Sequence, residues 1–314
     1  MGSILAAGAM GIVQCQSAVE DYTTLVEQVG IPIVQVEPSY ARQQRMVTVN
    51  ECGDDRYNTI ADFLNVEYQP VCGDHSHPWA RDHFIDLGYR IMVPESTMAE
   101  SFPENLERAK SIRAVMDTVD ARVTGAPFFF EGGQVLATHE HTLVPEAFSE
   151  QRFYPYATAV FENALLVPNN VEGNMAFSGH LDMYVTPVNR DTVLVADIVT
   201  LGSDDLSRVS ESYGKVVNSD DPRFAEVVDR AADMLSEHYN VERVPMAIVN
   251  NGENIFLGYN NAIVNGDKIV ISKYGISLDD KIRKQYEHYG EVLQVESRDW
   301  AEQSSGPHCQ ANLY

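Results

Sequence analysis

The sequence contains few cysteines and no long apolar run. Its 314 residues include four cysteines, at positions 15, 52, 72 and 309, which is too few for a disulfide framework. No two of them have the Cys-x-x-Cys spacing that is typical of a structural zinc site. No apolar run reaches the roughly 20 residues that a membrane-spanning helix needs. These absences favour an ordinary globular protein without a structural metal.

Basic residues are also scarce. The chain has 22 Lys and Arg against 46 Asp and Glu, which gives a formal charge of -24. Nucleic acids and anionic membranes are bound through Lys and Arg patches, so neither is expected as a partner. An acidic surface attracts cationic ligands, but salt screens that attraction over about 10 Å. We therefore attribute most of the acidity to solubility or to a salty habitat.

The N-terminal residues are small and apolar, yet they lack the basic start of a signal peptide. The first Lys or Arg of the sequence is Arg42. A secretory signal begins with a positively charged region, so we do not expect one here. We expect a cytoplasmic protein, with secretion as the alternative.

Short strands, turns and occasional helices alternate along the chain. Apolar spacing predicts helices over residues 105–117, 224–239 and 278–288. Residues 182–188 and 192–198 are expected to form a strand pair across an Asn-Arg-Asp turn. The order strand-strand-helix-strand recurs at a spacing of roughly fifty residues, which is typical of a propeller or an array. No low-complexity linker interrupts the chain, so we expect one domain over residues 1–314.

Four short segments carry residues suited to catalysis, and each is expected at a strand end or a turn. Taken singly, each has a structural explanation: an inert buried thiol, a structural histidine, a tight glycine turn or a surface ion pair. Their order along the chain is more informative than any one of them. The candidate residues are Trp79, Arg81 and Asp82 in Trp-Ala-Arg-Asp, Glu131 before two glycines, His180 and Asp182 in Gly-His-Leu-Asp, and Cys309 in Gly-Pro-His-Cys.

In this order the segments resemble the guanidino-group-modifying enzymes. That superfamily includes arginine, agmatine and peptidyl-arginine deiminases, dimethylarginine hydrolases and amidinotransferases. The resemblance covers residues 79–312 and includes the later segments at 259–266 and 274–275. It implies an α+β fold, the five-bladed α/β-propeller called a pentein, with ββαβ repeats around a central active site.

The resemblance also implies a role for each candidate. Cys309 would be the nucleophile, His180 the acid and base, and Glu131 the group that orients His180. The substrate-binding residues would be Asp82, Asp182, Trp79 and Arg81. No metal or other cofactor is implied.

The chemistry of a guanidinium agrees with these residue types. The group is cationic and its N–H donors suit paired carboxylates. Its carbon is a poor electrophile, so a thiolate nucleophile and a proton donor for the leaving ammonia are needed. The expected reaction is deimination through a covalent thiouronium, which releases ammonia and a ureido product of the citrulline type.

The substrate is less well indicated. The family usually has glycines before its cysteine, whereas this chain has Ser-Ser-Gly-Pro at 304–307, and Gln310-Ala311 replaces the Ile-Thr of agmatine deiminases. The pattern His308-Cys309-x-x-Asn312 resembles the corresponding segment of animal peptidyl-arginine deiminases. We rank a small agmatine-like or arginine-derived substrate first and a peptidyl-arginine substrate second. An amidinotransferase on the same fold is a further alternative.

Two hypotheses from other functional classes stay open. The pairs His75 and His77, and His139 and His141, have the spacing of metal ligands and would suit a metal-dependent hydrolase. A catalytically inactive propeller that only binds a ligand is the other. The acidic residues are too dispersed to identify a calcium site, and the oligomeric state is open, with a homodimer as one option.

Overall fold

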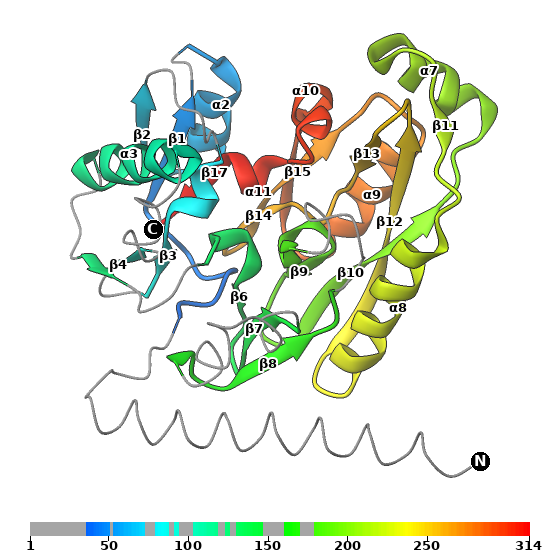
Figure 1. Ribbon diagram of the computed structural model, residues 1–314. Helices are drawn as coiled ribbons and strands as arrows, with labels where there is room; N and C mark the ends of the chain where they lie inside the picture. Colours follow the sequence, from blue (N-terminus) through cyan, green and yellow to red (C-terminus); the bar gives the residue numbers. More distant parts are fainter. Residues whose placement is uncertain are drawn as a thin grey trace.

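A computed structural model describes residues 36–50, 53–72, 79–87, 91–93, 103–118, 123–125, 130–146, 160–169 and 179–314. These residues form a mixed α+β fold with five separate sheets, which surround the middle of the molecule (Figure 1). Within the described ranges, no helix is long and apolar enough to cross a membrane. Of the expected metal-ligand pairs, His75 and His77 lie outside the described residues.

The five sheets share one pairing pattern. In each, the first strand pairs antiparallel with the second, and the second pairs parallel with a third. The first sheet has β3 (Ile85–Asp86), β4 (Ile91–Val93) and β5 (Val123–Gly125), and the second has β6 (Leu136–Ala137), β7 (Thr142–Pro145) and β8 (Ala164–Val167). The third has β9 (Val185–Pro187), β10 (Thr192–Val199) and β12 (Asn240–Asn250), and the fourth has β14 (Ile263–Asn265), β15 (Lys268–Lys273) and β16 (Glu291–Glu296). The fifth has β17 (Ala311–Leu313), β1 (Arg45–Asn50) and β2 (Glu67–Cys72).

The last of these sheets joins the two ends of the described chain. β17 pairs antiparallel with β1, with Val47 opposite Asn312, and the C-terminus lies beside the early strands (Figure 1). Since β17 follows Cys309 directly, this pairing fixes the candidate nucleophile to a sheet whose other strands come from residues 45–72.

Helices connect the parallel strands in four of the five sheets, as is usual for a parallel pair, and most of the connection between β7 and β8 lies outside the described residues. These crossover helices are α2 (Asp55–Leu64), α3 (Pro103–Thr118), α8 (Pro222–Ser236) and α9 (Leu278–Tyr286). The helices expected at 105–117, 224–239 and 278–288 are therefore confirmed, although the second ends at Ser236 and the third at Tyr286, and the recurring order of elements is found in four of the five sheets. The remaining secondary structure comprises α7 (Ser203–Tyr213), α10 (Arg298–Glu302), α11 (Pro307–Gln310), β11 (Val217–Asn218) and β13 (Asn254–Leu257).

Capping and periodicity explain these helices locally. Asp221 accepts a hydrogen bond from the Arg223 amide, and Pro222 occupies the first turn of α8, where it needs no donor. The buried residues of α8 follow the helical repeat from Phe224 to Leu235. α2 is capped in the same way by Asp54.

The largest sheet is buried on both faces. On β10, Val193 and Val195 belong to the hydrophobic cluster that includes α8, while Leu194 belongs to the cluster that includes α9. This alternation is the two-residue period of a strand, and apolar residues at every position mark a sheet that is covered on both sides. Cys309 belongs to the first cluster, so the candidate site borders the core.

Candidate active site

Four of the five sheets are preceded by a short turn or a single turn of helix, and these segments carry the candidate residues. Asp82 lies in the 3-10 turn Ala80–His83 before β3, and Glu131 precedes the turn Gly132–Gln134 before β6. His180 and Asp182 lie at the turn Leu181–Met183 before β9. Cys309 lies in α11 before β17. This placement differs from the expected strand at 182–188, which begins only at Val185 because the preceding residues form the turn.

Glu131, Gly132 and Gly133 form a turn that needs both glycines. A Cβ on Gly132 would lie 1.9 Å from the carbonyl oxygen of Arg81. A Cβ on Gly133 would lie 2.6 Å from Nδ1 of His180 and 2.9 Å from Oδ1 of Asp182. The glycines thus let the turns before β3, β6 and β9 approach more closely than any side chain would allow.

His180 lies among three carboxylates. Its Nε2 is 2.8 Å from Oε2 of Glu131, and its Nδ1 is 3.8 Å from an oxygen of Asp82 and 3.8 Å from one of Asp182. Burial disfavours a charge on the ring, but the three carboxylates outweigh burial and raise the pKa of His180 to about 10. The ring is therefore an imidazolium at neutral pH.

Cys309 is buried and lies between Asn261 and Asp182. The side-chain amide of Asn261 donates to Sγ at 2.9 Å, and its oxygen accepts from the Cys309 amide at 3.0 Å. Sγ lies 3.4 Å from Oδ2 of Asp182. Burial and the charges of Asp182 and Asp82 raise the pKa of the Cys309 thiol well above its usual range, so the substrate-free thiol keeps its proton.

Asp182 connects the nucleophile to a second histidine. Its Oδ2 lies 2.8 Å from Nδ1 of His308, while its Oδ1 is fully buried and has no hydrogen-bond partner. Burial alone would raise the pKa of Asp182, but His308, His180 and Arg81 together lower it, so the group is a carboxylate. A buried carboxylate oxygen that accepts no hydrogen bond suits the N–H donor of a cationic ligand.

Of the remaining expected site residues, Arg81 is buried and held inside the protein. Its guanidinium donates to Oδ1 of Asn312 at 3.0 Å and to the carbonyl oxygen of Val135 at 3.2 Å. Trp79 is partly buried and packs against the cluster that contains Cys309. The structure therefore brings Asp82, Glu131, His180, Asp182 and Cys309 together, while substrate contacts of Arg81 and Trp79 stay a prediction.

The sequence analysis gave no role to Asn261 or His308, although Asn261 lies in the family-like segment 259–266 and His308 directly precedes Cys309. Asn261 stands in the Tyr-Asn-Asn-Ala segment before β14, and it contacts the candidate nucleophile through two hydrogen bonds. Gly306 also acts here, because a Cβ on it would lie 2.9 Å from Asn261. The single glycine of Ser-Ser-Gly-Pro is thus placed where contact with Asn261 leaves no room for a side chain.

One group in the described part of the chain has the donors for a metal ion: Asp82, Glu131 and His180. Neither His139 nor His141 belongs to it. His139 is exposed, and Nδ1 of His141 lies 2.5 Å from the hydroxyl of Tyr239. The spacing of His139 and His141 therefore does not place them in a three-ligand cluster among these residues.

Comparison by sequence gives no relatives: no protein-family profile matches the chain, and no curated protein matches it. Comparison of structures does. An agmatine deiminase of Enterococcus faecalis superposes with a TM-score of 0.64 at 13% identity, over 92% of this chain and 96% of that one. A C. jejuni agmatine deiminase with substrate bound gives 0.62 at 11% identity, over 88% and 95%.

A third neighbour is the dimethylarginine hydrolase DDAH of Pseudomonas aeruginosa, in complex with citrulline. It superposes with a TM-score of 0.51 at 10% identity, over 87% of this chain and all of that one. The structural neighbours are thus guanidino-modifying enzymes, which confirms the expected mixed α+β fold, while the five-bladed propeller stays a prediction. At this identity the likeness concerns the fold, so the activity has to be argued from the site.

Proposed function

We propose that this chain is a cysteine-dependent deiminase, which hydrolyses a C–N bond of a guanidino group. The observation that carries the proposal is the contact of Cys309 with Asp182, which together with Asp82 flanks the imidazolium of His180. Asp82 is 3% exposed and Asp182 is 1% exposed, and together with Glu131 they outnumber the imidazolium of His180 beside them, so a further cation at close range is favoured. A guanidinium supplies that charge together with N–H donors for both.

The fold supports a single five-bladed α/β-propeller domain. Five sheets share one pairing pattern, and four of them are preceded by a turn that holds a site residue, which suits blades arranged around an axis. The pairing of β17 with β1 would close this ring, as propellers close.

In the first half of the proposed reaction, the substrate cation lies between Asp82 and Asp182. Its charge offsets the two carboxylates that raise the pKa of Cys309, and the thiolate forms. The sulfur attacks the guanidinium carbon, and His180 gives its proton to the departing amino group. Ammonia leaves, and a thiouronium stays bound to Cys309.

In the second half, His180 is neutral and takes a proton from water. The hydroxide adds to the thiouronium carbon, and collapse of the adduct breaks the C–S bond while the hydroxyl proton of the adduct passes to water. A ureido product leaves, and the sulfur is again a thiolate. Glu131 holds Nε2 of His180 throughout, so Nδ1 stays directed at the reacting atoms.

The structural neighbours include agmatine deiminases, which favours a small guanidino substrate such as agmatine. An agmatine-like amine has two positive charges and no carboxylate, and the acidic chain attracts it weakly at long range. A peptidyl-arginine substrate is the second candidate, and an amidinotransferase is the third, with an amine as acceptor in place of water.

Ammonia release tests the function. The purified chain should release ammonia from one member of a panel of agmatine, arginine, methylated arginines and an arginyl peptide, without an added amine. Cys309→Ala should lower the rate by a factor on the order of 10⁴. Absence of ammonia from the whole panel would exclude these substrates, and release only with an added amine would favour the amidinotransferase.

A chelator separates this proposal from metal-dependent hydrolysis at Asp82, Glu131 and His180. Ammonia release should persist after dialysis against a chelator, because the proposed steps use a thiolate. If the chelator abolished ammonia release and added zinc or manganese restored it, metal-dependent hydrolysis would be favoured instead. A tenfold preference for the arginyl peptide over agmatine, about 1.4 kcal/mol in transition-state binding, would reverse the order of the substrates.

A further inference from the structure

Cys309 has to carry a negative charge twice in the proposed reaction, and this inference rests on that proposed function. The sulfur is a thiolate when it attacks the guanidinium carbon, and it receives an electron pair again when the C–S bond breaks. Cys309 is 4% exposed, and both Asp182 and Asp82 oppose a charge on its sulfur. A buried anion is costly unless a hydrogen-bond donor is directed at it. The N–H groups of the substrate bind the carboxylates, so the protein itself has to supply this donor.

Asn261 places such a donor at the sulfur. Its Oδ1 lies 3.0 Å from the backbone nitrogen of Cys309. A backbone N–H can only donate, so the atom that faces it has to be the oxygen of the side-chain amide. Nδ2 of Asn261 therefore faces Sγ of Cys309, at 2.9 Å. One side chain thus binds both the backbone and the sulfur of the nucleophile, and the backbone contact fixes which end of the amide meets the sulfur.

The amide of Asn261 is held in this orientation before any charge forms on the sulfur. Asn261 is 2% exposed, and its backbone oxygen accepts from the amide of His308 at 3.3 Å. Its Nδ2 also lies 3.4 Å from the backbone oxygen of Asp182, which can accept the second hydrogen. A Cβ on Gly306 would lie 2.9 Å from the Asn261 side chain, so the glycine lets the segment before Cys309 pass close to it. A donor that is fixed in advance needs no reorganisation when the sulfur ionises.

The other polar groups near the sulfur do not replace this donor. Within the described residues, Asp182 is the other side chain that is hydrogen-bonded to Sγ, at 3.4 Å, and a carboxylate can only accept. The charge of Arg81 interacts with that of Cys309, but its guanidinium donates to Asn312 and Val135.

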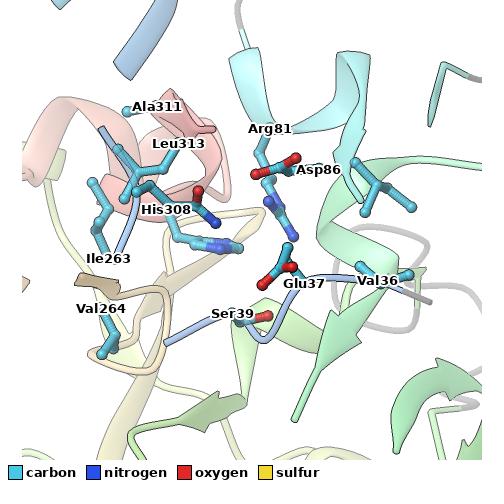
Figure 2. Close-up of a pocket in the computed structure, with 12 residues that line it drawn as sticks. Val36, Glu37, Ser39, Arg81, Asp86, Ile263, Val264, His308, Ala311 and Leu313 are labelled. Atoms are coloured by element: carbon cyan, nitrogen blue, oxygen red, sulfur yellow. The ribbon is translucent and has the colours of Figure 1, made fainter. Parts of the chain in front are cut away.

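Arg81 and His308 are also directed toward a separate cavity. This cavity of about 30 Å³ is lined by both residues, together with Glu37 among others. Figure 2 shows the side chains of Arg81 and His308 pointing toward each other across it, with Glu37 also directed into it. Nδ1 of His308 donates its hydrogen to Oδ2 of Asp182, 2.8 Å away. The two basic side chains thus use their donors elsewhere, and Asn261 is the side-chain donor at Sγ among the described residues.

We propose that Asn261 stabilises the Cys309 thiolate, as the side-chain donor to its sulfur in both halves of the reaction. No bond of the amide is made or broken, and its hydrogens stay on nitrogen. In the first half the N–H meets the electron pair that ionisation leaves on the sulfur, and in the second half it meets the pair that the broken C–S bond returns. A hydrogen bond to a charged atom is roughly twice as strong as one to a neutral atom, so the donor favours thiolate over thiol. Burial and the two carboxylates raise the pKa of Cys309, and this contact lowers it.

The alternative is a purely structural role, in which Asn261 only holds the backbone amide of Cys309. Asn261→Leu separates the two roles, because leucine has nearly the same size but no donor, acceptor or charge. Alkylation of Cys309 by iodoacetamide over a range of pH, with the label located by peptide mapping, reports the thiol pKa without substrate. We expect the midpoint of this curve to rise by about one pH unit, which is an about tenfold change in the balance of thiol and thiolate. A merely loosened α11 would instead admit water to the sulfur, and water would lower the pKa.

Turnover gives a second measurement of the same effect. With agmatine, or with whichever panel substrate the wild type turns over, kcat of Asn261→Leu at pH 7 should fall by about tenfold or more, because less of the bound enzyme carries a thiolate. KM should change less than about threefold, since the carboxylates that bind the substrate are unchanged. Asn189→Leu is the matched control, because Asn189 is an exposed turn asparagine whose Oδ1 also accepts from a backbone amide, that of Asp191. It should leave both the alkylation curve and kcat unchanged.

If Asn261→Leu does not fold, Asn261→Ala decides by the same two measurements. An alkylation midpoint at or below that of the wild type in the folded variant, or a wild-type kcat, overturns the role of Asn261 while the deiminase proposal stands. A wild type that releases no ammonia from the panel overturns the deiminase proposal instead. The alkylation curve needs no turnover, so in that case it still decides whether Asn261 stabilises the thiolate.

Discussion

Oε2 of Glu131 lies 2.8 Å from Nε2 of His180, and this contact leaves Nδ1 of the same ring 3.8 Å from both Asp82 and Asp182. The histidine is thus oriented by one carboxylate and directed toward the two that would bind the substrate. In a catalytic triad, a third group orients the base in the same way. The relationship depends on Gly133, which provides the space for it.

Gly133→Ala should therefore lower activity strongly. Its Cβ would lie 2.6 Å from Nδ1 of His180, which forces the ring or the turn to move. A displacement of about 1 Å in a catalytic group can cost on the order of 100-fold in rate, so we expect a loss of kcat/KM of that size. Gly179→Ala is the control, since it adjoins His180 but meets only Gln134 at 3.8 Å. Equal kcat/KM in the two folded variants would contradict the geometry.

Asp82→Asn and Asp182→Asn should each weaken substrate capture. Each change removes one charged acceptor for the guanidinium, and hydrogen bonds to charged groups contribute about 1.5–3 kcal/mol. We expect kcat/KM to fall at least tenfold in both. Glu226→Gln removes one exposed negative charge on α8, outside the set of candidate site residues, and should leave kcat/KM unchanged. An Asp82→Asn enzyme with both constants intact would show that Asp82 is not a substrate ligand.

The raised pKa of His180 predicts a pH-dependent contribution to stability. A histidine whose pKa rises from about 6.5 in the unfolded chain to about 10 in the folded one stabilises the fold fully below pH 6.5. The contribution declines as the pH rises above that and is lost through pH 10. The difference in unfolding free energy between wild type and His180→Asn should therefore shrink steadily from pH 7 to pH 10. A difference that stays constant over this range would mean that the ring is neutral.

Alkylation reports the protonation of Cys309. Burial, Asp182 and Asp82 raise the pKa of its thiol, so iodoacetamide should react slowly at neutral pH and faster as the pH rises. Asp182→Asn removes one of these charges and should shift the curve to lower pH. Peptide mapping should place the label that follows this pH dependence on Cys309, and Cys72, which is disulfide-bonded, should not be labelled. A wild-type rate at pH 7 equal to that of a free small thiol would contradict the raised pKa.

The sequence predicted the local elements well, for physical reasons. The helix α8 has an acidic cap, a first-turn proline and an apolar face with helical spacing, all of which are local signals. The motifs around Asp82, Glu131, His180 and Cys309 also lie where the structure has turns, because glycines and short polar segments favour turns.

Local signals of this kind could not predict contacts between distant parts of the chain. The pairing of Val47 with Asn312 joins segments at the two ends of the described chain, and no local pattern reports it. Asn261 looked like an ordinary turn residue, since its contact with Cys309 depends on how two sheets meet. The bonded state of Cys72 was likewise not apparent from cysteine spacing.

The central claim is that Cys309 forms a covalent intermediate with a guanidino carbon. Rapid quench of the wild type with a panel substrate that releases ammonia, followed by intact-mass analysis, tests it directly. We predict a transient species heavier than the enzyme by the substrate minus one ammonia, with the added mass mapped to the peptide of Cys309 and missing in Cys309→Ala. Two results would contradict the account: ammonia release by the wild type without this adduct, or undiminished ammonia release by folded Cys309→Ala.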